Sequence, residues 1–144
     1  MEGYRSEAIS LLIGLGAGFI LGYWTHALTI VREAADRRRL FRTRIQEWKT
    51  LIEDATYLNL HTRHMDSLPD LRTQCRVIEE DVRWWRRSRF RAACQTYAAI
   101  PRTEIEPPPR SSHSDEETQK RRQHHQAAKA RLLALLDRLA RLTA

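Results

Sequence analysis

The sequence predicts an all-α protein in which a single N-terminal transmembrane helix continues into a cytoplasmic antiparallel helical hairpin, followed by a linker-tethered C-terminal helix. Three observations indicate this. Residues 8–31 carry no formal charge, apolar residues recur every three or four positions in the polar remainder, and a proline-rich stretch separates two such patterns. The expected segments are a short extracytoplasmic leader (1–7), the transmembrane helix (8–31), the helical hairpin 32–100 (helices 32–64 and 69–100), the linker (101–114) and a C-terminal amphipathic helix (115–143).

The uncharged stretch 8–31 is long enough to cross a bilayer. A helix rises about 1.5 Å per residue, so a hydrocarbon core of about 30 Å needs about 20 apolar residues. Tyr23 and Trp24 lie near its far end, where amphipathic rings favour the headgroup layer. The run is too long for the apolar core of a cleaved signal peptide, so we interpret it as a retained signal-anchor.

Positive charge is distributed unevenly around this stretch. Only Arg5 precedes it. Lys and Arg in short flanks collect on the cytoplasmic side of a membrane, so we predict that the N-terminus lies outside and the tail lies in the cytoplasm. The arginines expected at the membrane surface are Arg32, Arg37, Arg38, Arg39, Arg42 and Arg44.

Small residues form one face of the predicted span. Gly14, Gly18 and Gly22 are spaced four apart, and Ser10 continues the spacing backwards. Such a face lets a second helix backbone approach closely. It therefore predicts a helix-pairing surface, and a homodimer or another helical membrane protein as partner, although glycine is common in membrane helices in general.

The hairpin and the last helix each carry an apolar stripe. Helix 32–64 has no Gly or Pro to separate it from the span. A stop signal at 65–70 follows, in which Ser67 can cap the next helix and Pro69 lies in its first turn, and that helix ends before Pro101. Ser114 and Glu117 form a capping box for the last helix. The predicted helix–helix seam comprises Phe41, Ile45, Trp48, Ile52, Ile78, Val82, Trp85, Leu132, Leu135, Leu139 and Leu142.

Two cysteines are predicted to be free thiols. If Cys75 and Cys94 share the helix 69–100, they lie about 28 Å apart along it. A disulfide requires Cα atoms within about 7 Å of each other. Free thiols agree with a reducing cytoplasm.

The densest chemical feature is an arginine- and tryptophan-rich run at 83–91, in a chain of formal net charge +7. Its candidate anionic-ligand residues are Arg83, Trp84, Arg86, Arg87, Arg89 and Arg91. They could contact anionic lipid with Trp at the interface, or grip nucleic-acid phosphates while rings stack on bases; lipid is favoured because the returning helix approaches the membrane. The alternative is a solvated helix face in which Trp85 belongs to the core.

No catalytic or metal-binding pattern is evident. His61, His64, His124 and His125 lack the spacing of a metal site, and no nucleophile elbow, phosphate loop or dinucleotide fingerprint is present. We therefore expect no enzyme activity, cofactor or small-molecule substrate. The glycine-spaced anchor and basic helical tail resemble the layout of small bacterial inner-membrane coiled-coil proteins of the cell envelope.

The predicted function is that of a single-pass membrane-anchored helical interaction or scaffold protein. One alternative is a membrane-tethered nucleic-acid-binding protein that uses residues 83–91. Another is an envelope or lysis protein whose tail lies outside the cytoplasm.

Overall fold

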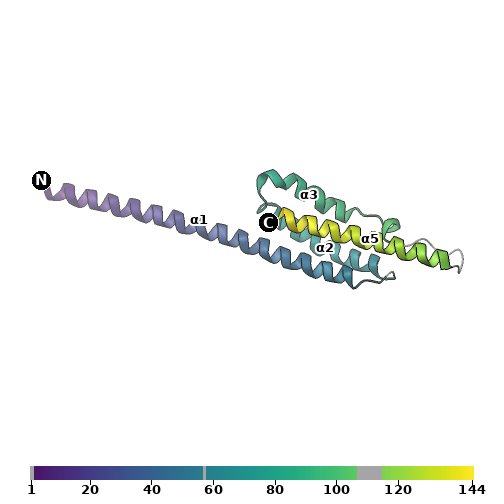
Figure 1. Cartoon of the computed structure of the whole chain (residues 1–144). Coiled ribbons are helices and arrows are strands. Elements are labelled where there is room, and N and C mark those ends of the chain that lie inside the picture. Colours follow the sequence, from purple (N-terminus) through teal and green to yellow (C-terminus); the bar gives the residue numbers. More distant parts are fainter. Residues whose placement is uncertain (1, 57, 107–114) are drawn as a thin grey trace. The chain divides into compact units, whose positions relative to one another are not determined.

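The computed structural model describes residues 2–56, 58–106 and 115–144, with side chains from residue 11 onwards. This part of the chain is helical and contains no strand, which confirms the predicted all-α class. The helices are α1 (Glu2–Glu53), α2 (Leu60–Glu79), α3 (Trp84–Ala98), α4 (Arg102–Ile105) and α5 (Asp115–Leu142) (Figure 1). They belong to two compact units, Met1–Asp36 and Arg37–Ala144.

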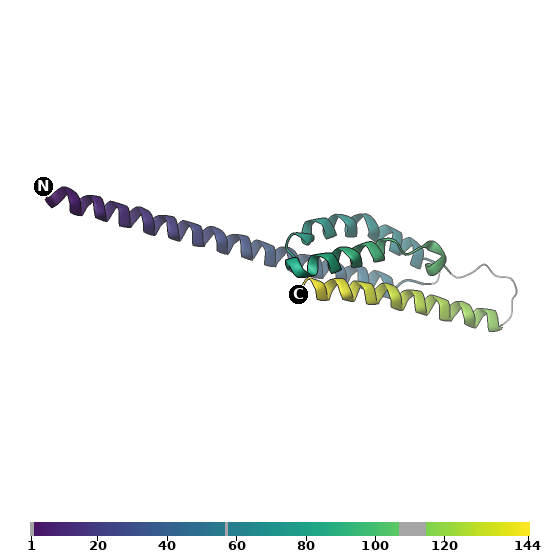
Figure 2. The same ribbon diagram turned by 90° about the horizontal axis from the view of Figure 1, so that it is seen from above.

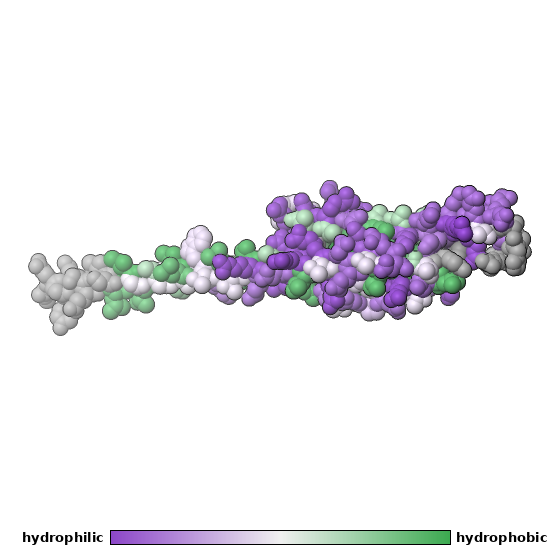
Figure 3. Space-filling view, turned by 60° about the horizontal axis from the view of Figure 1, so that its bottom comes forward, coloured by the Kyte–Doolittle hydropathy of each residue, from purple (hydrophilic) through white to green (hydrophobic). Residues whose placement is uncertain are grey.

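The first unit consists of the apolar part of α1. By length and composition, one helix in the described part of the chain could cross a membrane, and it is α1 from Leu11 onwards. None of its apolar window is buried, and hydrophobic side chains are exposed along it (Figure 3). Phe19, for example, is 80% exposed. A helix that is apolar on all sides suits a lipid environment rather than a surface position in water.

The second unit is an antiparallel four-helix bundle formed by the end of α1 with α2, α3 and α5, which lie side by side in Figures 1 and 2. Contacts between distant residues fix the helix directions. Lys49 on α1 pairs with Asp137 on α5 at 2.9 Å, and Lys129 of α5 bonds to the carbonyl of Ala55 at 3.2 Å. Since higher numbers on α5 meet lower numbers on α1, these two helices are antiparallel.

The core of this unit draws apolar residues from every helix. Phe41 of α1 packs edge-on against Phe90 of α3 with ring centroids 5.8 Å apart. Of the predicted seam, Leu135 and Leu142 are half-buried against the core, and the buried members are Phe41, Ile45, Trp48, Ile52, Ile78, Val82, Leu132 and Leu139.

Trp85 is a correction to the predicted seam, because it is 52% exposed. Phe90, Ala93 and Tyr97 set the buried face of α3. At 100° per residue Trp85 lies about 140° away from Phe90 around the helix, and so it points outward.

The predicted turn at 65–68 is wrong: the chain reverses earlier, between Glu53 and Leu60, and residues 65–70 lie inside α2. The reversal contains no Gly or Pro, but the Asn59 side chain accepts a hydrogen bond from the Thr56 N–H at 2.8 Å, a local bond that competes with a helix. Pro69 lies within α2 on an exposed face, one turn after the exposed Met65, so the helical hydrogen bond that it cannot donate is missing on the outer side of the helix.

The single predicted helix over 69–100 is also wrong, because the chain turns at 80–83 and forms α2 and α3. Acidic residues end α2, where the helix dipole disfavours them, and Val82 in the turn is buried. The lengths of α2 and α3, about 30 and 22 Å, are close to that of the bundle part of α1, about 25 Å, whereas a single helix over 69–100 would be about 48 Å long.

The predicted linker begins with ordered structure. Helix α4 lies within it and buries Ile105 in the core. The triple proline and the Ser114 cap lie outside the described residues. The chain then enters α5, for which the sequence predicted 115–143.

Leu132→Ala is expected to lower the free energy of unfolding of the second unit by about 2–5 kcal/mol, because Leu132 is fully buried and truncation leaves a cavity. The measurement is denaturant unfolding of the full chain in detergent, in a Trp24→Phe, Trp84→Phe, Trp85→Phe background whose tryptophan emission comes from the buried Trp48 alone.

Leu133→Ala is the matched control, since Leu133 is half-buried on the neighbouring position of α5. Equal losses for the two variants would contradict the described register of α5.

Candidate functional site

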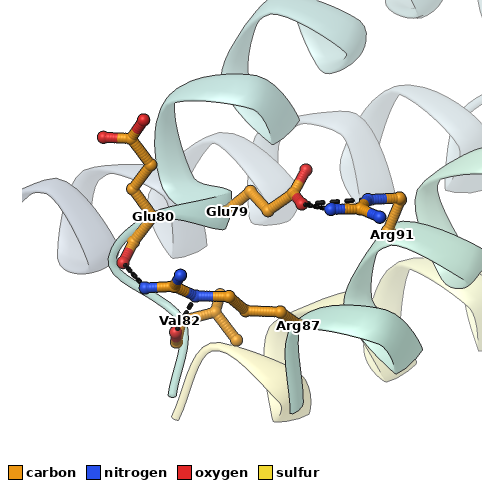
Figure 4. A network of polar contacts seen from close by, with 5 residues as sticks. All are labelled: Glu79, Glu80, Val82, Arg87 and Arg91. Atoms are coloured by element: carbon orange, nitrogen blue, oxygen red, sulfur yellow. Dashed lines mark hydrogen bonds and ion pairs between the residues drawn. The ribbon is translucent and has the colours of Figure 1, made fainter. Parts of the chain in front are cut away.

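The arginines of the run 83–91 divide into two sets in the structure. Arg87 points back into the turn that precedes α3 (Figure 4). Its Nε donates to the Val82 carbonyl at 3.0 Å and its Nη2 donates to the Glu80 carbonyl at 2.6 Å. Both carbonyls lie in the turn 80–83 that follows α2. Arg87 therefore holds the turn 80–83 in place.

Arg91 is likewise engaged within the bundle. It forms an ion pair with Glu79, and its Nε lies 2.9 Å from that carboxylate (Figure 4). The carboxylate raises the pKa of Arg91 by accepting its hydrogen bonds. The pair ties α3 to α2.

The start of α3 presents the remaining members outward. Trp84 is 77% exposed, and its ring meets that of Trp85 edge to face at 5.7 Å. The Arg83 guanidinium lies 5.4 Å from the centre of the Trp85 ring, a cation–π distance. Arg89 is exposed on the same helix, and the half-buried Arg86 reaches the Arg141 carbonyl at 3.5 Å.

The arginines expected at the membrane surface lie on α1, on both sides of the boundary between the units. Arg37 makes a bidentate ion pair with Asp81, at 2.7 and 2.9 Å, and Arg44 pairs with Glu47 at 2.7 Å. Asp81 is almost buried, so the Arg37 pair fixes the turn 80–83 against the first residues of the bundle. Arg38 is half-buried, and the exposed members are Arg32, Arg39 and Arg42.

Cys75 and Cys94 form a disulfide, contrary to the predicted free thiols. The prediction assumed one helix, whereas the turn at 80–83 places Cys75 on α2 opposite Cys94 on α3 with their Cα atoms 6.7 Å apart. A crosslink closing a loop of this length stabilises a fold by about 3 kcal/mol in the chain-entropy account. The missing signal was the turn, which no Gly or Pro announces.

A surface groove of about 600 Å³ runs along this disulfide, between α2 and α3. Its rim carries the guanidinium groups of Arg72, Arg76 and Arg91. Arg91 is paired with Glu79, whereas Arg72 and Arg76 line the groove without an ion pair to that carboxylate.

His64 is a buried residue that the sequence analysis did not single out for the core. It is 1% exposed, and its ring packs edge-on against Tyr97 at 4.9 Å. The Ser67 hydroxyl donates to the His64 carbonyl at 2.7 Å and lies 3.3 Å from the Tyr97 hydroxyl. Burial, followed by the nearby His61, lowers the pKa of His64 to about 4. The sequence pattern that could have predicted this burial is the helical spacing of Leu60, His64, Leu71 and Cys75. These residues form one buried face of α2 that extends on both sides of Pro69.

Neither protein-family models nor the curated proteins or solved structures gave a match for this chain.

Metal-binding side chains are not grouped in the part of the chain that the structure describes, where no three of His, Cys, Asp and Glu could hold an ion together. His61 and His64 lie on α2, and His124 and His125 lie on α5.

The glycines of the pairing face have open space around them. A Cβ atom built at Gly14, Gly16, Gly18 or Gly22 meets nothing within 4 Å. The side chain of Ser10 lies outside the described residues. Packing within the chain therefore does not explain these glycines.

His64→Phe is expected to make the stability of the bundle less sensitive to acid. Above pH 6.5 His64 is neutral in both states, whereas between about pH 6.5 and 4 the unfolded chain gains this proton and the folded chain does not. Protonation of His64 in the unfolded chain therefore lowers the free energy of unfolding of the wild type by about 3 kcal/mol as the pH falls from 6.5 to 4. The measurement is the free energy of unfolding from pH 7 to pH 4.

His61→Phe, one turn earlier on α2, is the matched control for losing a histidine from that helix. An identical acid dependence in wild type and His64→Phe would contradict a buried neutral His64.

Proposed function

We propose that the chain is a single-pass, membrane-anchored helical scaffold that presents a basic four-helix bundle at a membrane surface and has no catalytic activity. The observation that carries the proposal is the exposure of large apolar side chains over residues 11–31, including Leu12 at 69% and Phe19 at 80%. A segment of this length without burial is expensive in water and favourable in lipid. A partner protein that binds the anchored bundle is thereby localised at the membrane.

The charge bias supports an orientation with the tail in the cytoplasm. Six arginines lie within 15 residues after the apolar segment, whereas only Arg5 lies before it. A cytoplasmic flank is expected to carry this excess of positive charge. In this orientation the bundle would recruit a cytoplasmic partner.

The disulfide favours a second candidate function, in which the bundle lies outside the cytoplasm as part of the cell envelope. Disulfides persist in oxidising compartments and are rare in a reducing cytoplasm. The Cys75–Cys94 pair therefore opposes the orientation that the arginines favour. The two candidates differ in one measurable property, the side of the membrane on which the bundle lies.

The orientation can be measured with a reporter cysteine. In a Cys75→Ser, Cys94→Ser background, Ala144→Cys places a single thiol at an exposed position after α5. With a cytoplasmic bundle, a membrane-impermeant maleimide should label this thiol only after the cells are permeabilised. The same protein should stay in the membrane pellet through alkaline extraction, because the apolar helix spans the bilayer.

Ser6→Cys in the same background is the matched control on the other flank, and it should give the opposite pattern. Labelling of Ala144→Cys in intact cells would contradict a cytoplasmic bundle and favour the candidate function in the cell envelope. Release of the protein by alkaline extraction would end both.

We further propose that two copies, or this chain and another membrane helix, pair through Gly14, Gly18 and Gly22. Small residues four apart allow close backbone contact, for which van der Waals packing is the main driving force in lipid. The open space around these glycines supports helix pairing, because no contact within the chain requires small residues at these positions.

Gly18→Leu is expected to reduce self-association in bilayers severalfold, because a bulky side chain separates the paired backbones. The measurement is energy transfer between donor- and acceptor-labelled full chains at a fixed protein-to-lipid ratio.

Gly16→Leu is the control, since Gly16 lies about 160° around the helix from Gly18 and has the same open surroundings. Equal effects of the two substitutions would contradict pairing through this face.

A further inference from the structure

The first turn of α3 exposes two adjacent indole rings. Trp84 is 77% exposed and Trp85 is 52% exposed, and among the residues of the bundle that the structure describes they form the largest uncovered aromatic surface. Their rings contact each other at 5.7 Å, and Arg83 holds its guanidinium over Trp85. Tryptophan side chains are enriched at interfaces where one end of the ring meets an apolar environment and the other end meets water.

Free cations flank these rings. In the described part of the chain, no acidic side chain pairs with Arg83 or Arg89, whereas the neighbouring Arg87 and Arg91 are both engaged. We call Arg83, Trp84, Trp85 and Arg89 the tryptophan patch. The patch combines unpaired guanidinium groups with amphipathic rings, which matches the chemistry of a headgroup layer.

The position of the patch within the bundle is fixed by Arg37. Arg37 is the first residue of the second unit, and it pairs with Asp81 at 2.7 Å. Asp81 is only three residues before Trp84. The patch therefore lies at the end of the bundle where the chain enters it.

The length of chain before Arg37 limits how far this end can lie from the apolar segment. Val31 is the last residue of that segment, and six residues further on the chain reaches Arg37. Six residues span at most about 20 Å even when fully extended. This limit holds for any angle between the two units, and such a short tether gives the patch a high effective concentration of membrane surface.

We propose that the tryptophan patch docks on the anionic lipid surface of the membrane that the apolar helix crosses. Trp84 and Trp85 enter the headgroup layer, and Arg83 and Arg89 contact lipid phosphates. This inference rests on the proposed membrane anchoring and adds a second contact to it. Lipid is a better fit than single-stranded nucleic acid because the tether keeps lipid constantly within reach.

The test uses tryptophan emission from the full chain, one copy per nanodisc, in phosphatidylcholine–phosphatidylglycerol bilayers with brominated acyl chains. Trp24→Phe leaves Trp84 and Trp85 as reporters, and Trp84→Phe, Trp85→Phe leaves Trp24 as a reporter of the span. Both variants retain Trp48, which is buried and shielded from lipid. The variant that leaves only Trp48 supplies the baseline.

The expected result is that bromine removes most of the emission of Trp84 and Trp85. The loss should shrink in about 1 M salt, where charges are screened beyond about 3 Å, and in Arg83→Gln, Arg89→Gln. The matched charge control is Arg72→Gln, Arg76→Gln on exposed positions of α2, which should keep the full loss.

Each other outcome overturns a distinct statement. Quenching of Trp24 without quenching of Trp84 and Trp85 overturns lipid docking and leaves the anchor in place. Absence of quenching at Trp24 overturns the anchoring itself. A salt-sensitive change in Trp84 and Trp85 emission with single-stranded oligothymidylate, but not with brominated lipid, would assign the patch to nucleic acid instead.

Discussion

The bundle depends on how two chain reversals, one after α1 and one after α2, satisfy their carbonyl groups. At the end of α1, Lys129 of α5 bonds to the carbonyls of Glu53 and Ala55. At the end of α2, Arg87 of α3 bonds to the carbonyls of Glu80 and Val82. Neither reversal contains the glycine that commonly ends a helix. In both places a cation from a later helix supplies the hydrogen bonds, so each reversal is held by a helix that packs beside it.

This arrangement explains which parts of the fold were predictable. The apolar segment and the helical character of the tail follow from local patterns, namely missing charge and a period near 3.6. The two reversals do not, because their stabilising donors, Lys129 and Arg87, are distant from the turn or indistinguishable from surface arginines in the sequence. Pro69 added an error, because a proline is more typical of the first turn of a helix than of its interior.

The errors in the candidate site follow from the missed turn at 80–83. A continuous helix separates Cys75 from Cys94 and places Trp85 in the seam, whereas the turn joins the cysteines and moves the ring to the surface. The composition of the run 83–91 did indicate a cationic aromatic surface. It could not indicate that Arg87 and Arg91 are used to hold the fold, which leaves fewer residues for a ligand.

An even number of antiparallel helices also determines where the chain leaves the bundle. Arg141, at the end of α5, lies against Arg86 of α3, close to the turn that Arg37 holds. A fluorescent protein or affinity tag joined after Ala144 would therefore emerge beside the entry point of the chain. Bulky fusions there would crowd that end of the bundle.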